Sequence, residues 1–202
     1  MDIERFKTIE GRVERAIKIE RSEFIATLSY VANDEDARAF ISEISKKYKN
    51  ATHNCPAYRV LGGSGIIEFA SDAGEPSGTA GVPMLNVLRR EALLNVGVVV
   101  TRYFGGVKLG IRGLIEAYTR SVEEVVRYAK ELGLIVVKKR AYKQKLKINF
   151  PSYGKKMQQL AYMGVNILDI SYDEHYAYVE VLSESVLDLP EVIETSVFYV
   201  RE

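Results

Sequence analysis

Residues 96–113 read VGVVVTRYFGGVKLGIRG, and this stretch decides the fold of the first part of the chain. The continuous apolar run 96–101 predicts a strand covered on both faces, because a strand with one wet face would alternate apolar and polar residues. A glycine-rich loop follows, and apolar residues then recur at helical spacing from Leu114 to Ala129. The stretch therefore predicts a buried central strand that leads through a loop into a long helix.

Three cations, Arg102, Lys108 and Arg112, fall where the predicted strand ends and the predicted helix begins. Backbone N–H groups at a helix start attract anions, and glycines let a ligand approach the backbone closely, so this loop is a candidate anion site. The alternative is that the glycines serve a tight crossover and the cations are simply solvated. Because Arg102 ends the predicted buried strand, we expect its guanidinium to be partly buried and held by a carboxylate or by backbone carbonyls.

The composition suits a soluble globular protein of one or two domains. The chain has 202 residues, of which 47% are hydrophobic and 27% charged, and its net charge is +1. It contains no apolar run long enough to cross a membrane, and the charged N-terminus argues against a signal peptide. The single Cys55 excludes an intramolecular disulfide and favours the reducing cytoplasm.

The first part of the chain alternates strands and helices before and after the central strand. Asn33 or Asp34 is a good helix cap, and Pro83 is tolerated in the first turn of a helix. The predicted elements are two strands within residues 4–31 with a turn at 19–22, a helix through Lys47, strands at 53–61 and 66–70 joined by the turn 62–65, a polar loop at 71–81 and a helix at 82–94.

The second part of the chain predicts a β-α-β-β-α-β order, which is the ferredoxin-like pattern. Gly133 is a suitable C-cap for the long helix, so we expect a domain boundary between Lys130 and Leu134, with domains at 1–132 and 133–202. The fold class is α+β. The predicted elements are a strand at 135–150, a helix at 152–163, strands at 165–172 and 176–182, a short helix at 186–192 and a strand at 196–200.

Four blocks of the sequence resemble the signature of the IMPACT/YigZ family. They are Ser22–Ala26 (SEFIA), His53–Ala57 (HNCPA), Asp72–Pro83 (DAGEPSGTAGVP) and Val98–Gly110 (VVVTRYFGGVKLG). The resemblance implies two domains, the first like domain IV of elongation factor G and the second like its domain V. Both of those domains work against RNA on the ribosome. Eukaryotic members of the family regulate translation by competing for an activator of a stress kinase, so the resemblance implies a translation-linked role.

A cationic run in the second part is the candidate nucleic-acid surface. Residues 138–156 contain eight cations and no acid. On a strand, Lys143, Lys145 and Lys147 share one face, with Lys139 on the same side, and such a stripe can follow a phosphate backbone. The alternatives are a solubilising face or an edge strand that lysines protect from aggregation.

Other polar residues offer weaker candidates for chemistry. His53 and Cys55 share a strand face, but residues two apart lie about 6.5 Å from each other, which is long for a catalytic dyad. One Cys and two His cannot fill a tetrahedral zinc site without carboxylates, so no metal and no cofactor is expected. Asp72, Glu75 and Thr79 either cap turns or form a cleft with Arg102 and Lys108.

These observations leave three hypotheses about function. The first is a non-enzymatic regulator of translation that associates with RNA or the ribosome. The second is an enzyme or a binder of small anions or nucleotides, whose cleft joins Asp72, Glu75 and Thr79 to Arg102, Lys108 and Arg112. The third is a regulator that acts through protein–protein interaction. No complete catalytic constellation is present, which favours a non-enzymatic role in the cytoplasm, with no membrane partner; the oligomeric state stays open.

Overall fold

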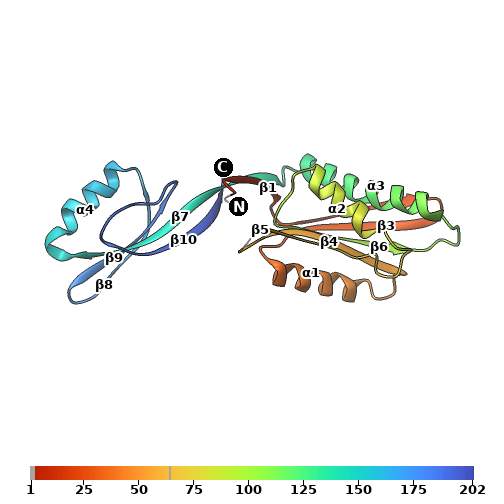
Figure 1. Ribbon diagram of the computed structural model, residues 1–202, viewed down its shortest axis with the longest axis horizontal. Coiled ribbons are helices and arrows are strands. Elements are labelled where there is room, and N and C mark those ends of the chain that lie inside the picture. The colour runs from red at the N-terminus through yellow and green to blue at the C-terminus, as the bar shows by residue number, and fades with distance from the viewer. Residues whose placement is uncertain (1–2, 64) are drawn as a thin grey trace. The chain divides into compact units, whose positions relative to one another are not determined.

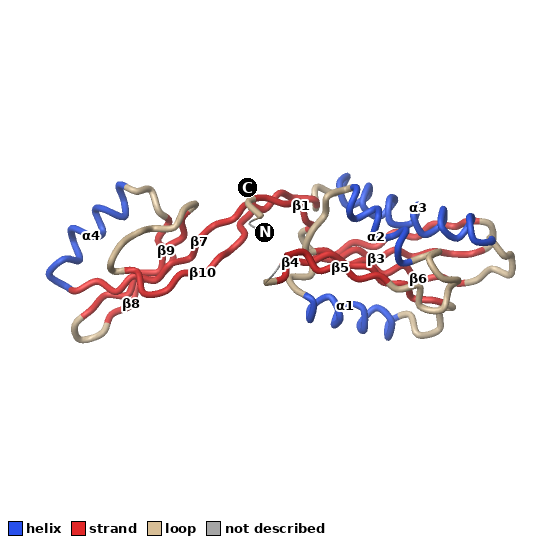
Figure 2. The backbone as a smooth tube through the Cα atoms, viewed as in Figure 1, coloured by secondary structure: helices blue, strands red, loops and turns tan. Residues whose placement is uncertain are grey.

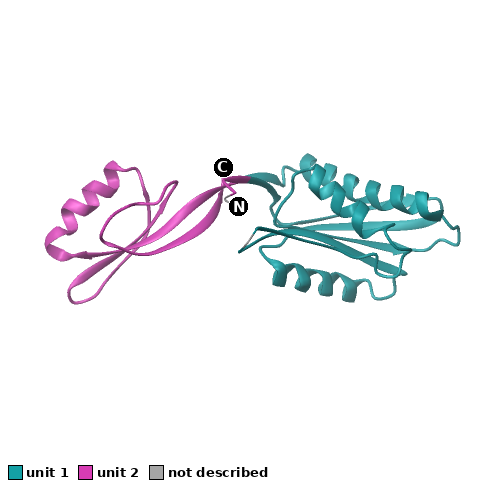
Figure 3. Cartoon of the chain, in the orientation of Figure 1, with its two compact units in different colours: residues 1–2, 6–137 teal, residues 3–5, 138–202 magenta. Residues whose placement is uncertain are grey.

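The computed structural model describes residues 3–63 and 65–202. It consists of two compact units: residues 6–137 form the first unit, and residues 3–5 with residues 138–202 form the second (Figure 3). The sequence places the domain boundary between Lys130 and Leu134, whereas the units divide a few residues later, inside a long strand. Ser64, which belongs to the expected turn at 62–65, lies outside the described residues.

The first unit is built on one five-stranded antiparallel sheet with the strand order β2-β3-β6-β4-β5. The predicted central strand is confirmed as β6, which pairs with β3 on one side and with β4 on the other (Figure 1). The elements are β1 (Arg5–Ile9), β2 (Arg12–Ile19), β3 (Ser22–Tyr30), α1 (Asp34–Lys47), β4 (His53–Gly62), β5 (Gly65–Ala70), α2 (Gly81–Arg90), β6 (Val96–Tyr103) and α3 (Gly110–Glu131).

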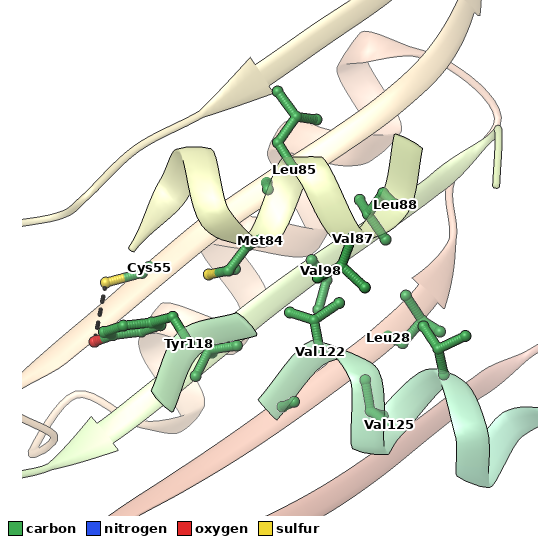
Figure 4. Packing of buried hydrophobic residues seen from close by; sticks show 14 of the residues in the cluster. Leu28, Cys55, Met84, Leu85, Val87, Leu88, Val98, Tyr118, Val122 and Val125 are labelled. Atoms are coloured by element: carbon green, nitrogen blue, oxygen red, sulfur yellow. Dashed lines mark hydrogen bonds between the residues drawn. The ribbon is translucent and has the colours of Figure 1, made fainter. Parts of the chain in front are cut away.

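Helices cover both faces of this sheet, which explains the continuous apolar run in β6 (Figure 2). Val98 and Val100 point into the larger core beneath α2 and α3, whereas Val99 points into the smaller core beneath α1. Figure 4 shows the larger core, where Val122 of α3 packs with residues of α2 and of the sheet. Each fully buried valine stabilises the fold by roughly 1.5–3 kcal/mol, which explains why β6 is apolar from Val96 to Val100, before Thr101 and Arg102.

Local signals set the helix ends in this unit. Asn33 caps α1 as expected, and its side-chain oxygen accepts a hydrogen bond from the Asp36 backbone. The helix predicted at 82–94 ends earlier, at Arg90. The last residues of the predicted helix pair with β1 instead, since the Leu94 backbone N–H donates a hydrogen bond to the Lys7 carbonyl. Backbone pairing with a distant strand therefore overrides the helical pattern.

The strands within residues 4–31 number three, where the sequence predicts two. Gly11 adopts a φ of 83°, a left-handed conformation that glycine reaches without strain, and it breaks the first predicted strand into β1 and β2. The chain can therefore turn between Ile9 and Arg12, and β1 leaves the first sheet to pair with β7 (Ile135–Asn149).

The second unit is built on a five-stranded sheet with the strand order β1-β7-β9-β8, in which β10 also pairs with β7; β7 is antiparallel to both β9 and β10, and β9 is antiparallel to β8. One face packs against a helix through a core that includes Leu146, Leu160 and Val179. The opposite face is covered by no helix among the described residues, and we call it the open face. The remaining elements are α4 (Phe150–Tyr162), β8 (Asn166–Tyr172), β9 (Tyr176–Ser183) and β10 (Val192–Arg201).

The helix predicted at 186–192 is wrong, because this segment is an irregular loop that leads into β10. The amide of the buried Gln144 side chain accepts a hydrogen bond from the Leu187 N–H and donates one to the Leu187 carbonyl. Leu187 and Leu189 fill the core directly from the loop. Pro190 is also unfavourable in a helix interior, so the side chain of Gln144 satisfies backbone groups that a helix would otherwise satisfy.

Within the described residues, no helix combines the length and apolar character needed to cross a bilayer.

Candidate functional site

A buried ion pair lies at the end of the central strand. In the sheet, Arg102 of β6 pairs with His53 of β4 on one side and with Phe24 of β3 on the other. These three side chains therefore lie on the same face of the sheet, the one that α2 and α3 cover. The Arg102 Nη1 donates to Glu75 Oε1 at 2.7 Å, and the two side chains are only 6% and 3% exposed. This confirms the expectation that a carboxylate holds a partly buried Arg102 guanidinium.

Tyr118 completes this cluster from α3. Its hydroxyl donates to the same Glu75 oxygen at 2.8 Å, so Oε1 accepts from two donors. Burial raises the pKa of the Tyr118 hydroxyl well above its ordinary value, and the phenol therefore stays protonated and able to donate. The sequence predicts Tyr118 only as part of the apolar face of the helix. The signal in the sequence is the hydroxyl group of Tyr118, because a buried tyrosine hydroxyl usually finds a hydrogen-bond partner.

Aromatic rings enclose the guanidinium of Arg102. Its central carbon lies 5.4 Å from the ring centroid of Phe24 and 5.4 Å from that of Phe104. The Nη2 donates to the Ser22 hydroxyl at 3.4 Å, and Nε has no hydrogen-bond partner among the described residues. Phe104 and Ser22 are residues that the sequence did not assign to the site.

His53 and Cys55 do not form a dyad. The His53 Nδ1 lies 3.0 Å from the Ala73 carbonyl, which can only accept, so Nδ1 carries the proton and Nε2 points toward Glu75 Oε2 at 3.9 Å. The Cys55 thiol donates instead to the Asp72 carbonyl at 3.0 Å. Burial raises the pKa of Cys55 to about 12, so at neutral pH it is a thiol and not the thiolate that nucleophilic catalysis requires.

Asp72 and Thr79 hold the polar loop in place. Asp72 Oδ1 accepts from the backbone N–H groups of Ala80 and Gly81, and its Oδ2 accepts from Gly78. Burial opposes ionisation of Asp72, but these three donors outweigh it and lower its pKa. The buried Thr79 hydroxyl donates to the Pro76 carbonyl. Both side chains therefore fix the loop that carries Glu75 and precedes α2.

A cavity of about 380 Å³ opens beside the buried ion pair, and we call it the Glu75 cavity. It brings together three of the predicted cleft residues, Glu75, Arg102 and Lys108. The other three do not line it, since Asp72 and Thr79 serve the loop and Arg112 is exposed and paired with Glu116. The rest of its lining is Thr52, His53, Pro76, Phe104, Leu109, Gly110, Ile111 and Leu114.

The predicted lysine stripe lies on the open face of the second unit. Lys143, Lys145 and Lys147 are partly exposed, whereas the residues between them, Gln144, Leu146 and Ile148, are buried. Lys139 forms an ion pair with Glu184.

Neighbouring strands bring acids to this stripe. Lys145 lies opposite Glu180 of β9 and opposite Glu194 of β10, and the Lys143 ammonium contacts Glu180 at 2.7 Å. The run is therefore acid-free along the chain but not across the sheet. Lys147 instead lies over the Tyr176 ring, with Nζ 4.0 Å from the centroid. Strand register decides these contacts.

Comparison with known proteins shows that the part of the chain carrying this site is similar to a known protein family. The pattern of the Impact N-terminal domain matches residues 20–126. The IMPACT family member YvyE of Bacillus subtilis (strain 168) is 54% identical over 117 residues, which are 58% of this chain and 54% of that protein. An IMPACT family member of Thermus thermophilus, in the pol 5′ region, is 37% identical over 137 residues, 68% of this chain and 70% of that protein.

A solved structure shares the fold over most of the chain. A crystal structure of a hypothetical protein has 27% sequence identity and a TM-score of 0.64, and the alignment covers 90% of this chain and 86% of that chain. The match to YvyE spans about half the length of that relative.

Proposed function

The chain belongs to the family of the Impact N-terminal domain, and from this membership we propose that it is a translation-linked regulator that binds RNA, free or in the ribosome. The family resemblance supports the translational part of the proposal. The expected likeness of the two units to domains IV and V of elongation factor G belongs to the same proposal, as does a cytoplasmic location. The role is one of binding and not of catalysis.

The open face of the second unit supports the RNA part of the proposal. It places Lys145 and Lys147 of β7 beside Tyr176 and Tyr178 of β9, with all four side chains partly exposed. In a common class of RNA-binding domain, aromatic rings on the face of a β-sheet stack on the bases. Stacking on one ring is worth about 1–3 kcal/mol per base. This interleaving of rings and cations is the observation that carries the proposal.

Acidic residues on the open face limit how much electrostatic attraction can contribute to RNA binding. Glu180 and Glu194 flank Lys145, and Glu180 is already paired with Lys143. Among the described residues, Lys145 and Lys147 have no carboxylate within 4.0 Å and contact only tyrosine rings, so no acid competes with a phosphate for these two ammonium groups. Two phosphate contacts predict a shallow salt dependence on single strands, with a slope of about −1.4.

The experiment is a titration of single-stranded RNA, followed by fluorescence anisotropy at several salt concentrations. The double variant Lys145→Ala/Lys147→Ala should bind several times more weakly at low salt and should lose about 1.4 from the salt slope. Lys155→Ala is the matched control, because Lys155 is an exposed cation on α4 of the same unit. Glu180→Gln should strengthen binding, since it removes an acid from the face and frees Lys143.

The proposal fails if the parent protein does not bind RNA at low salt. It also fails if Lys155→Ala weakens binding as much as the double variant does, because RNA would then be attracted by general charge and not by the open face.

A further inference from the structure

The Glu75 cavity has the features of a ligand site that the proposed RNA binding does not use. It lies wholly within the first unit, between the end of β6, the loop that carries Glu75 and the start of α3. Its volume of about 380 Å³ falls in the range of small-molecule sites. Three parts of its lining differ in chemistry, and each part selects a different portion of a ligand.

The inner end of the cavity offers hydrogen-bond acceptors. Glu75 Oε1 is saturated by Arg102 and Tyr118, whereas no donor reaches Oε2 among the described residues. The His53 Nδ1 directs its proton at the Ala73 carbonyl, and Nε2, which keeps a lone pair in this Nδ1–H tautomer, is the ring nitrogen that faces Glu75 Oε2. Glu75 Oε2 and, in this tautomer, His53 Nε2 lie 3.9 Å apart, too far to bond each other, and both favour a ligand that presents N–H donors.

The outer end of the cavity offers positive charge. Lys108 is exposed and has no carboxylate within 4.0 Å among the described residues. Gly110 and Ile111, which line the cavity, begin the long helix α3. The first turn of α3 contains no acidic residue, and no side chain of Leu109 caps it, so its backbone N–H groups remain available to an anion.

The walls between these ends are apolar and open to solvent. Phe104 is 45% exposed and Ile111 is 67% exposed, and Leu109 and Leu114 lie beside them. The Phe104 ring is held by the guanidinium of Arg102, whose side chain is itself buried. Exposed apolar side chains around a cavity gain free energy when a flat ring covers them.

We propose that the Glu75 cavity binds a nucleoside monophosphate. The N–H groups of the base donate to Glu75 Oε2 and His53 Nε2, the ring covers Phe104, and the phosphate lies at Lys108 and the start of α3. A simple anion would leave the acceptors at the inner end unused, and a simple amine would be repelled by Lys108. Only a ligand that joins a donor-bearing ring to an anionic group uses all three parts. The inference is independent of RNA binding by the second unit.

The test is a titration of the full chain with AMP, GMP, CMP and UMP, followed by isothermal calorimetry and by amide chemical shifts. At least one of the four should bind with a stoichiometry of one, and the shifts should cluster at residues of the cavity. The nucleoside that corresponds to the bound nucleotide should bind about tenfold more weakly, because it lacks the phosphate. Inorganic phosphate should also bind about tenfold more weakly, because it lacks the base.

Two exposed positions test the site without endangering the fold. Lys108→Ala should weaken nucleotide binding about tenfold, the loss expected for one charge-assisted contact. Arg112→Ala is the matched control, since Arg112 is a cation in the first turn of the same helix but does not line the cavity. Ile111→Glu should also abolish binding, because it places a carboxylate at the mouth.

The inference is overturned if none of the four nucleotides binds at millimolar concentration, or if inorganic phosphate binds as tightly as they do. It is also overturned if Arg112→Ala weakens binding as much as Lys108→Ala. The variant Lys145→Ala/Lys147→Ala should bind the nucleotide as the parent does, which separates this site from the open face.

Discussion

Glu75 and Arg102 form an ion pair of 2.7 Å although both side chains are more than nine-tenths buried. The pair ties a polar loop to the central strand of the first sheet. Removing two charges from water is costly, and the cost is repaid only where hydrogen bonds satisfy both groups. Here the Tyr118 hydroxyl donates to Glu75 Oε1 and Arg102 Nη2 donates to the Ser22 hydroxyl, so hydrogen bonds offset part of this cost. The first unit therefore depends on the presence of both partners.

Removing one partner should be far more harmful than removing both. Arg102→Met or Glu75→Leu alone should lower the free energy of unfolding by about 3–5 kcal/mol, because each leaves a buried charge unpaired. The double variant should recover most of this loss. Urea unfolding of the three variants measures the effect, with Glu116→Gln as a control from an exposed pair that contributes less than about 1 kcal/mol. Additive losses in the double variant would contradict the prediction.

Gly105 should not tolerate a side chain. A Cβ at this position would lie 1.7 Å from the Arg21 carbonyl oxygen, which belongs to the backbone and cannot easily move. Gly105→Ala should therefore destabilise the protein by at least about 1–3 kcal/mol. Gly154→Ala serves as the opposite control, since a Cβ there meets no atom within 4 Å and lies in a helix. It should stabilise by up to about 1 kcal/mol, as measured by thermal unfolding.

Cys55 should resist thiol reagents in the native protein. Its pKa of about 12 lies above the ordinary 9.0 because the side chain is buried, so the reactive thiolate is absent near neutral pH. The unfolded chain ionises first, and the free energy of unfolding should therefore fall as the pH rises from about 9 to about 12. Absorbance after addition of an aromatic disulfide measures the reaction. Rapid labelling of the native protein at pH 7 would show that the thiol is accessible.

Glu68 should contribute to acid sensitivity. Arg89, with help from Arg59, holds the pKa of Glu68 at about 2, below the ordinary 4.5. The carboxylate therefore stabilises the fold above about pH 4.5, and this contribution is lost as the pH falls from about 4.5 to about 2. The variant Glu68→Gln should show a flatter decline in the free energy of unfolding across this window. Circular dichroism at several pH values checks it, and an unchanged decline would disprove the role of Glu68.

Asp72 should act as a structural cap for the polar loop. Its carboxylate accepts hydrogen bonds from three backbone N–H groups. Because Asp72→Ala removes all three bonds, it should lower the free energy of unfolding by about 1–2 kcal/mol. Ser77→Ala is a control in the same loop, because Ser77 is exposed. Equal losses in the two variants, measured by urea unfolding, would show that Asp72 has no special role.

Local patterns in the sequence determined the elements that hold the first unit together. The apolar run of β6, the Asn33 cap of α1 and the left-handed Gly133 after α3 each follow from the neighbouring residues alone. The expected environment of Arg102 follows in the same way, because a cation at the end of a buried strand must find a partner. Such features are local in the chain, and residue type and spacing are sufficient to predict them.

The tertiary structure decided which groups meet. Glu75 reaches Arg102 and Tyr118 only because the loop folds over the end of the sheet, and no spacing in the chain encodes that contact. Glu180 and Glu194 flank Lys145 only because of the strand register. Likewise, the Gln144 side chain forms hydrogen bonds with the backbone N–H and carbonyl of Leu187. The segment predicted as a helix can therefore be a loop. Hydrogen bonds and ion pairs act over a few ångströms in space, and the partners that come so close are set by how distant segments pack.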